Sequence, residues 1–160
     1  MRLKRCLFIV ALILADQLSK IAIKANLEVG ESVQVIGDFF QLSHINNYGA
    51  AMSMFQNDTL VLILIPVIAM VVAIWYLERH RDAHWSLALA IELIVGGVIG
   101  NLIDRATQGY VTDFLDFTGD IPFWNWIFNV ADIAVCVGCF LLVLYLFFFD
   151  KPEEKADGES

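Results

Sequence analysis

Charged residues are scarce in this sequence. Only 18% of its 160 residues are Asp, Glu, Lys or Arg, whereas 59% are hydrophobic, a balance outside the usual range of soluble globular domains. The basic residues form no stripe with interleaved aromatic residues, and no glycine-rich phosphate loop follows a strand-like segment. These absences argue against nucleic-acid and nucleotide binding and indicate a chain built for lipid.

Cysteine and histidine are also few, with three residues of each type. Cys6, Cys136 and Cys139 all lie in apolar runs, and the C-x-x-C formed by the last two lacks the soluble βαβ context of a redox motif. We interpret them as packing residues. Among the histidines, only His80 and His84 have i,i+4 spacing, which is more typical of a solvated helix face. We therefore expect no metal site and no cofactor.

Long apolar runs, by contrast, are abundant. A spanning helix needs roughly 20 mainly apolar residues, and four stretches qualify, at 6–23, 60–77, 86–103 and 128–149. The predicted fold is an all-α membrane protein with four transmembrane helices in one domain, residues 1–150. The acidic residues 151–160 are predicted to be a disordered cytoplasmic tail.

The Lys and Arg residues near the ends of these stretches indicate how the chain is oriented. Most of them precede the first stretch, separate the second from the third, or follow the fourth: Arg2, Lys4, Arg5, Arg79, Arg81, Lys151 and Lys155. Because positive charge favours the cytoplasmic side, both termini are predicted to be cytoplasmic. A cleavable signal peptide is an alternative for the first stretch, but it has no use for Asp16 and Lys20, which share one helix face.

Two long segments are predicted on the outer side of the membrane. The first contains residues 32–45, where apolar and polar residues mix around a turn signal at Gly37 and Asp38. This pattern predicts a small extracytoplasmic β-hairpin. The second segment, between the third and fourth spans, is predicted as an outer loop.

Charged residues within the spans need a partner or a function, because each costs at least about 2.5 kcal/mol on insertion scales. The chain has four of them, Asp16, Lys20, Glu92 and Asp132. Asp16 and Lys20 can form an i,i+4 ion pair, which leaves a structural and a functional role equally open. Glu92 is close enough to the cytoplasmic end to find a polar partner there, and we assign it no chemistry.

Asp132 lies about one turn below the predicted outer end of its span. Asp113, Asp116 and Asp120 lie in the preceding outer segment, and Asp113 follows the mainly apolar approach 109–112. Two adjacent carboxylates share one proton, so that one can activate water while the other polarises a peptide carbonyl. A purely structural acidic cluster would explain the same spacing, so the residues alone leave both readings open.

Five ordered sequence blocks give the chain a family resemblance. They are Asp16–Lys20 (DQLSK), Asn47–Ala51 (NYGAA), Gly100–Arg105 (GNLIDR), Val111–Phe114 (VTDF) and Phe128–Asp132 (FNVAD). In this order and on four spans, they make the chain similar to the bacterial lipoprotein signal peptidases, also called signal peptidase II.

The resemblance implies an aspartic endopeptidase of the bacterial inner membrane, with its active site facing the outer side. Its substrates would be prolipoproteins, cleaved just before their diacylglyceryl-modified cysteine. Asp113 and Asp132 match the catalytic pair, whereas Asp116 falls outside that role. The resemblance also implies a supporting set: Asp16, Lys20, Asn47, Gly49, Asn101, Asp104, Arg105 and Asn129. We further expect a monomer in contact with membrane phospholipid.

Two departures and two rival functions accompany this resemblance. Met52 stands where the family usually has an aromatic residue, and Ile133 stands where it usually has serine. A small proton-coupled transporter or channel component would also use buried carboxylates, but its acids would be spread through the membrane and inverted repeats are common in such folds. A non-catalytic membrane scaffold is the third interpretation.

Overall fold

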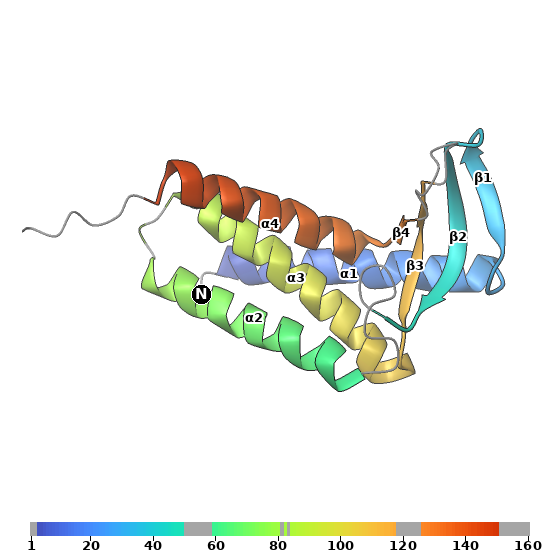
Figure 1. Ribbon diagram of the computed structural model, residues 1–160, viewed down its shortest axis with the longest axis horizontal. Helices are drawn as coiled ribbons and strands as arrows, with labels where there is room; N and C mark the ends of the chain where they lie inside the picture. The colour runs from blue at the N-terminus through green and yellow to red at the C-terminus, as the bar shows by residue number, and fades with distance from the viewer. Residues whose placement is uncertain (1–2, 50–58, 81, 83, 118–125, 151–160) are drawn as a thin grey trace, which may run out of the picture.

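Four long helices dominate the structure, a computed structural model that describes residues 3–49, 59–80, 82, 84–117 and 126–150. They are α1 (Leu3–Asn26), α2 (Thr59–Arg79), α3 (Trp85–Gln108) and α4 (Val130–Phe148), and they run side by side along the long axis (Figure 1). Each is long and apolar enough to cross a membrane. The prediction of four spans is confirmed. Asp120, Met52 and the predicted tail 151–160 lie outside the described residues.

Helix α3 is the central helix of the bundle and packs against each of the other three. Small residues allow this close packing, as is common between helices in membranes. At Gly100, an added Cβ would lie only 2.7 Å from Asp16 Oδ2 and 3.2 Å from Ala131 Cβ. Glycine at this position therefore lets α1 and α4 approach the same turn of α3.

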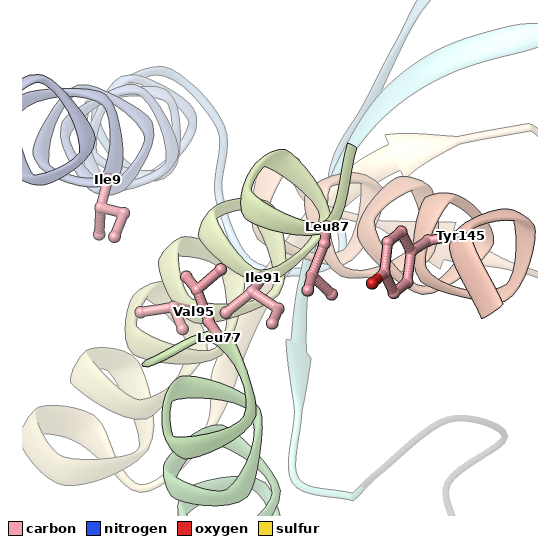
Figure 2. Packing of buried hydrophobic residues seen from close by; sticks show 6 residues of the cluster. All are labelled: Ile9, Leu77, Leu87, Ile91, Val95 and Tyr145. Carbon is pink, nitrogen blue, oxygen red and sulfur yellow. The ribbon is translucent and has the colours of Figure 1, made fainter. Parts of the chain in front are cut away.

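A cluster of buried apolar side chains connects all four helices in the half of the bundle away from the sheet (Figure 2). Its members are Ile9, Leu77, Leu87, Ile91, Val95 and Tyr145. Because α1 contributes Ile9 to this cluster, the first apolar stretch is packed as part of the fold. That packing favours a permanent span over a removable signal peptide.

A small antiparallel sheet lies at one end of the bundle (Figure 1). Its strands, in spatial order, are β1 (Ser32–Ile36), β2 (Phe40–Asn47), β3 (Val111–Asp116) and β4 (Ile127–Phe128). Strands β1 and β2 form the predicted hairpin, with Gly37 at a positive φ of +47° in the turn. The predicted β-hairpin is therefore confirmed.

The second outer segment differs from the loop we expected, because it contributes β3 and β4 to the same sheet. Strand β3 is almost entirely buried and lies between β2 and β4 in the sheet. The predicted fourth span also began too early. Phe128 belongs to β4, and Asn129 caps α4, so the helix starts at Val130.

The described chain begins and ends at the end of the bundle opposite the sheet (Figure 1). At that end Arg5 Nε lies 3.2 Å from Glu92 Oε1, so Glu92 has the polar partner expected from its position. This ion pair lies near the end of the bundle opposite the sheet and has no contact with Asp16, the other buried acid of the predicted spans, among the contacts described below.

Candidate active site

Asp113 and Asp132 reach the site from different elements and are joined by Asn129. Asp113 lies in the middle of β3, and Asp132 lies in the first turn of α4. Asn129 Nδ2 donates to Asp113 Oδ1 at 2.6 Å. Asn129 also forms a capping box with Asp132, in which each backbone N–H donates to the other side chain, at 2.9 and 3.1 Å. One fully buried asparagine therefore contacts both carboxylates.

Asn101, from α3, is a second side chain that connects Asp132 with Asn129. Its Nδ2 donates to Asp132 Oδ1 at 2.8 Å, and its Oδ1 accepts from Asn129 Nδ2 at 3.2 Å. Lys20 Nζ also donates to Asn101 Oδ1, at 3.1 Å. These contacts fix the orientation of the Asn101 amide, since its Nδ2 must face the Asp132 carboxylate.

Asn47, at the end of β2, contacts Asp113 from the other side. Its Nδ2 donates to Asp113 Oδ2 at 2.8 Å, while its Oδ1 accepts from the Gly49 backbone N–H at 2.9 Å. Arg105 Nη2 in turn donates to the Gly49 carbonyl at 3.2 Å. Both oxygens of Asp113 thus accept from asparagine amides, and the segment holding Asn47 is attached to α3.

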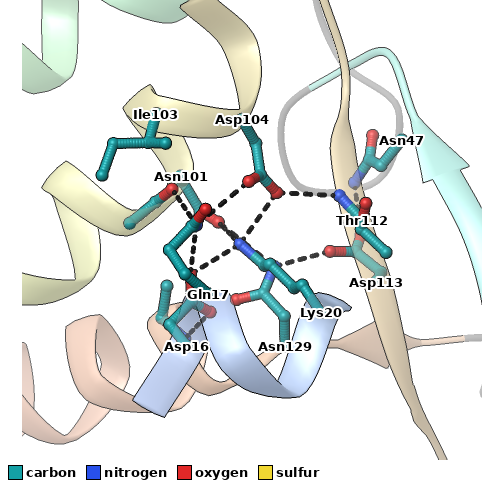
Figure 3. A network of polar contacts seen from close by, with 12 residues as sticks. Asp16, Gln17, Lys20, Asn47, Asn101, Ile103, Asp104, Thr112, Asp113 and Asn129 are labelled. Atoms are coloured by element: carbon teal, nitrogen blue, oxygen red, sulfur yellow. Dashed lines mark hydrogen bonds and ion pairs between the residues drawn. The ribbon is translucent and has the colours of Figure 1, made fainter. Parts of the chain in front are cut away.

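Figure 3 shows a buried ion cluster beside Asp113, formed by Asp16, Lys20 and Asp104. Lys20 Nζ lies 2.8 Å from Asp16 Oδ2 and 3.0 Å from Asp104 Oδ2. The predicted i,i+4 pair is present, and Asp104 of α3 is its third member. Burying such charges is expensive unless each is paired and hydrogen-bonded, and here one lysine is shared between two carboxylates.

The two acids of this cluster also bind backbone groups near the site. Asp16 Oδ1 accepts from the Ala131 N–H at 2.9 Å, and Asp104 Oδ2 accepts from the Thr112 N–H at 3.1 Å. Ala131 precedes Asp132, and Thr112 precedes Asp113. The ion cluster therefore holds the backbone beside each member of the pair.

Sequence reasoning gave no role to Gln17, although it lay in a matched block. Its Nε2 lies within hydrogen-bond distance of Asp16 Oδ2, the Gly100 carbonyl and Asp104 Oδ1, at 3.0–3.1 Å. An uncharged amide in an apolar span was the available signal, because such a group needs partners as a charge does.

The pKa of Asp113 is raised from its ordinary value to about 7. Burial is the largest cause, and the nearby Asp132 carboxylate acts in the same direction, whereas the amides of Asn47 and Asn129 and the charge of Lys20 oppose it. Near neutral pH the site can therefore keep one proton on Asp113.

An apolar cavity of about 240 Å³ borders Asp132 on α4. Besides Asp132, it is lined by Phe117, Phe128, Ile133, Cys136 and Val137. A larger cavity of about 440 Å³ at the end of α1 contains none of the predicted site residues in its lining. The small cavity is the one whose position fits chemistry at the carboxylates.

The structure connects both carboxylates and the eight predicted supporting residues through the contacts above. Asp116, the other described acid of the outer segment, is excluded from this set. It lies three residues beyond Asp113 in β3 and binds side chains of β2 instead. Asp113 is therefore the acid that the fold brings to Asp132.

Comparisons with known proteins identify relatives over nearly the whole chain. A family model described as signal peptidase (SPase) II matches residues 8–148. The chain is 39% identical over 145 residues to a lipoprotein signal peptidase of Clostridioides difficile (strain 630), covering 91% of this chain and 95% of that one. It is 38% identical over 162 residues to a lipoprotein signal peptidase of Shewanella sediminis, covering 95% and 88%.

The fold is also similar to that of a bacterial membrane enzyme solved by the in meso method. The TM-score is 0.83 at 26% identity, over 98% of this chain and 94% of that one. None of these comparisons supports the transporter interpretation. The matched residues, 8–148, include Asp113, Asp132 and all eight supporting residues. The chain therefore belongs to the signal peptidase II family of membrane aspartic peptidases.

Proposed function

We propose that this protein removes the signal peptide from prolipoproteins and cleaves just before the diacylglyceryl-modified cysteine, with Asp113 and Asp132 as the catalytic pair. The family match supports the reaction, and the relatives are named lipoprotein signal peptidases, which states the substrate class. One observation carries the residue assignment. Asn129 contacts both carboxylates, so two acids from different elements share one hydrogen-bonded unit.

The two carboxylates have different surroundings, and this difference assigns their roles. Asp132 lies in the first turn of α4, where the helix dipole favours negative charge, and it accepts from Asn101 and from the Asn129 backbone. Asp113 holds a proton near neutral pH, because burial and the Asp132 charge raise its pKa to about 7. Asp132 is therefore the base of the pair, and Asp113 is the acid.

Peptide cleavage then follows as general acid–base catalysis. Asp132 takes a proton from water as the water oxygen attacks the scissile carbonyl, while the Asp113 proton hydrogen-bonds to the carbonyl oxygen. When the tetrahedral intermediate collapses, the C–N bond breaks and the departing amine receives the proton held by Asp132. The products are the carboxylate of the signal peptide and the free amino group of the lipidated cysteine.

The surroundings of the pair suit a substrate anchored in lipid. The apolar cavity beside Asp132 fits hydrocarbon or apolar side chains. Arg105, whose guanidinium can bind carbonyl or phosphate oxygens, lies in the last turn of α3 near the Asn47 segment. The proposal includes a monomer in the bacterial inner membrane, in contact with phospholipid. Its termini are cytoplasmic, and its active site faces the outer side.

The test of this proposal is cleavage of a lipidated precursor by the purified protein in phospholipid nanodiscs. The wild-type protein should cleave the lipidated precursor at the modified cysteine and leave the unlipidated precursor largely intact. Asp113→Asn and Asp132→Asn should each lower kcat by more than roughly a thousandfold, as for residues acting as one catalytic unit. Cleavage by both variants at the wild-type rate would overturn the aspartic mechanism.

A further inference from the structure

Gln17 of α1 has no role in the mechanism above, yet its side chain contacts both acids of the buried ion cluster (Figure 3). Its Nε2 lies 3.1 Å from Asp16 Oδ2, 3.0 Å from Asp104 Oδ1 and 3.1 Å from the Gly100 carbonyl oxygen. All three neighbours are acceptors, so the nitrogen of the amide must face them. Gln17 therefore forms an uncharged link between α1 and α3, beside the charged link that Lys20 forms.

Asp16 does not depend on Gln17 for its orientation. Its Oδ1 accepts from the Ala131 N–H at 2.9 Å, and its Oδ2 lies 2.8 Å from Lys20 Nζ. Each oxygen of this carboxylate thus has a donor before Gln17 is counted. Loss of the Gln17 amide would leave both of these contacts in place, so the backbone beside Asp132 should stay held.

Asp104 depends on Gln17 more strongly. Lys20 Nζ and the Thr112 N–H both bind its Oδ2, at 3.0 and 3.1 Å. Among the described residues, Gln17 is the donor that Asp104 Oδ1 has. Asp104 is 2% exposed, and a buried carboxylate oxygen without a donor is costly. Without Gln17, the carboxylate would gain by turning Oδ1 toward Lys20, a rotation that takes Oδ2 away from the Thr112 N–H.

The Thr112 N–H contact bears on the catalytic acid, because Thr112 immediately precedes Asp113 in β3. The two oxygens of Asp113 accept from Asn47 and Asn129, at 2.8 and 2.6 Å. A shift of the β3 backbone would therefore disturb both bonds. In a preorganised site, a displacement of about 1 Å can cost a large part of the rate.

We propose that Gln17 is a positioning residue for the reaction, because its amide fixes the Asp104 carboxylate in the orientation that binds the Thr112 N–H. The Thr112 contact in turn holds the backbone of Asp113. The inference rests on the proposed function, since it takes Asp113 as catalytic. The effect is one-sided, because the backbone beside Asp132 is held without Gln17.

The experiment compares Gln17→Met with the wild type in the full-length protein, in phospholipid nanodiscs with a lipidated precursor. Methionine has a similar length and volume but no N–H donor. We expect kcat to fall about tenfold, which corresponds to the loss of one hydrogen bond to a charged group. KM should stay within about twofold, because Gln17 has no proposed contact with substrate. A wild-type kcat, or a change in KM alone, would overturn the proposal.

Gln34→Met is the matched control. Gln34 is an exposed residue of β1 whose Nε2 also donates to a carboxylate, Asp38 Oδ1, at 3.1 Å. The same substitution there should leave kcat close to that of the wild type, and equal losses in both variants would overturn the proposal. If Gln17→Met does not fold, Gln17→Asn keeps an amide but shortens the side chain by one methylene group. Its kcat should fall in the same direction, and a wild-type kcat in that variant would overturn the proposal.

Amide hydrogen exchange separates positioning from simple stabilisation. Exchange at the Thr112 N–H should be about tenfold faster in Gln17→Met than in the wild type, because Asp104 no longer holds it. Exchange at the Ala131 N–H should stay unchanged, since Asp16 keeps its other donors. Faster exchange at both positions with a lower unfolding temperature would mean a structural role only. Unchanged exchange at both would also overturn the proposed route.

A double-mutant cycle completes the test. Asp104→Asn has one acceptor oxygen for donors on both sides, so it disrupts the same route. If Gln17 acts through Asp104, adding Gln17→Met to Asp104→Asn should lower kcat little further. Additive losses would contradict the proposed route. The catalytic assignment is checked separately by Asp113→Asn. Cleavage by that variant would overturn the proposed function, whereas an inactive Asp113→Asn beside a fully active Gln17→Met would overturn only the positioning role.

Discussion

Asparagine amides account for most of the direct contacts to the two carboxylates. Asn47 and Asn129 donate to Asp113, and Asn101 and the Asn129 backbone donate to Asp132. An amide supplies a donor without adding charge, so these residues orient the pair, and their opposition to the raised pKa of Asp113 does not outweigh burial and the Asp132 charge. A lysine in their position would favour ionisation of both acids and remove the proton that the reaction needs.

The pH dependence of cleavage follows from this arrangement. Below about pH 7, Asp113 keeps its proton because its pKa is raised to about 7. As the pH rises through that value, Asp113 ionises and can no longer donate to the scissile carbonyl, so kcat should fall. At low pH, protonation of the base should lower kcat as well, giving a bell whose limbs belong to the pair. A flat profile between about pH 5 and 9 in nanodiscs would contradict the shared proton.

Arg105 offers a second test at the residue scale. Its guanidinium donates to the Gly49 carbonyl at 3.2 Å and keeps further donors in a planar fork. Arg105→Lys retains the charge but loses the fork, so kcat/KM should fall roughly tenfold or more while the protein stays folded. Arg79→Lys is the matched control, because Arg79 ends α2 at the other end of the bundle. Equal effects of the two changes on cleavage would argue against a specific role for Arg105.

How much of the site could be predicted depends on how local each contact is. The Asp16 and Lys20 pair follows from i,i+4 spacing on one helix. Spacing alone did not choose between Asp113 and Asp116 as the partner of Asp132, and the family pattern made that choice. The register of β3 gives the physical reason, because the two acids leave opposite faces of the strand. The role of Asp104 as a second partner of Lys20 was also out of reach, since it depends on how α1 packs against α3.

At the scale of elements, the long helices and the β1–β2 hairpin were predictable, whereas strands β3 and β4 were not. Four apolar runs of membrane-spanning length leave few alternatives for their structure. The hairpin of β1 and β2 carries its own turn signal at Gly37. Strands β3 and β4 carry none, because their partners are distant in sequence and β4 is two residues long. Their pairing depends on tertiary contacts.

The packing of α3 against its neighbours can be tested at Gly100. In Gly100→Ala the new methyl group would meet Asp16 Oδ2 at 2.7 Å and Ala131 Cβ at 3.2 Å. Both groups are fixed, since Asp16 binds Lys20 and the Ala131 N–H. Overpacking of this kind costs about 1–3 kcal/mol, so we expect a lower unfolding temperature in detergent and a loss of cleavage.

Gly96→Ala is the matched control for that change. It lies about one turn earlier on α3, and the new methyl group would meet Leu12 Cδ2, the end of a flexible side chain. Leu12 can change rotamer, so this variant should keep most of its stability and activity. If both alanine variants behaved like the wild type, the close approach of α1 and α4 at Gly100 would not matter for the site.

At the scale of the whole molecule, the number of spans and the position of the sheet are linked. Four spans return the chain to the side on which it started, and the sheet lies at the other end (Figure 1). The site therefore opens toward whichever side of the membrane the β1–β2 hairpin occupies. Membrane orientation thus decides which compartment supplies the water and receives the cleaved ends.

The distribution of Lys and Arg predicts that orientation. Basic residues flank the ends of the spans opposite the sheet, and the side with the sheet has few, which favours cytoplasmic termini. A reporter fused after Ser160 should therefore read cytoplasmic, and one inserted near Glu31 should read periplasmic. The same side for both positions would contradict the four-span fold, because an odd number of crossings separates them. If the reporter after Ser160 read periplasmic and the one near Glu31 read cytoplasmic, the four-span fold would stand but the active site would face the cytoplasm. That orientation would contradict the proposed function.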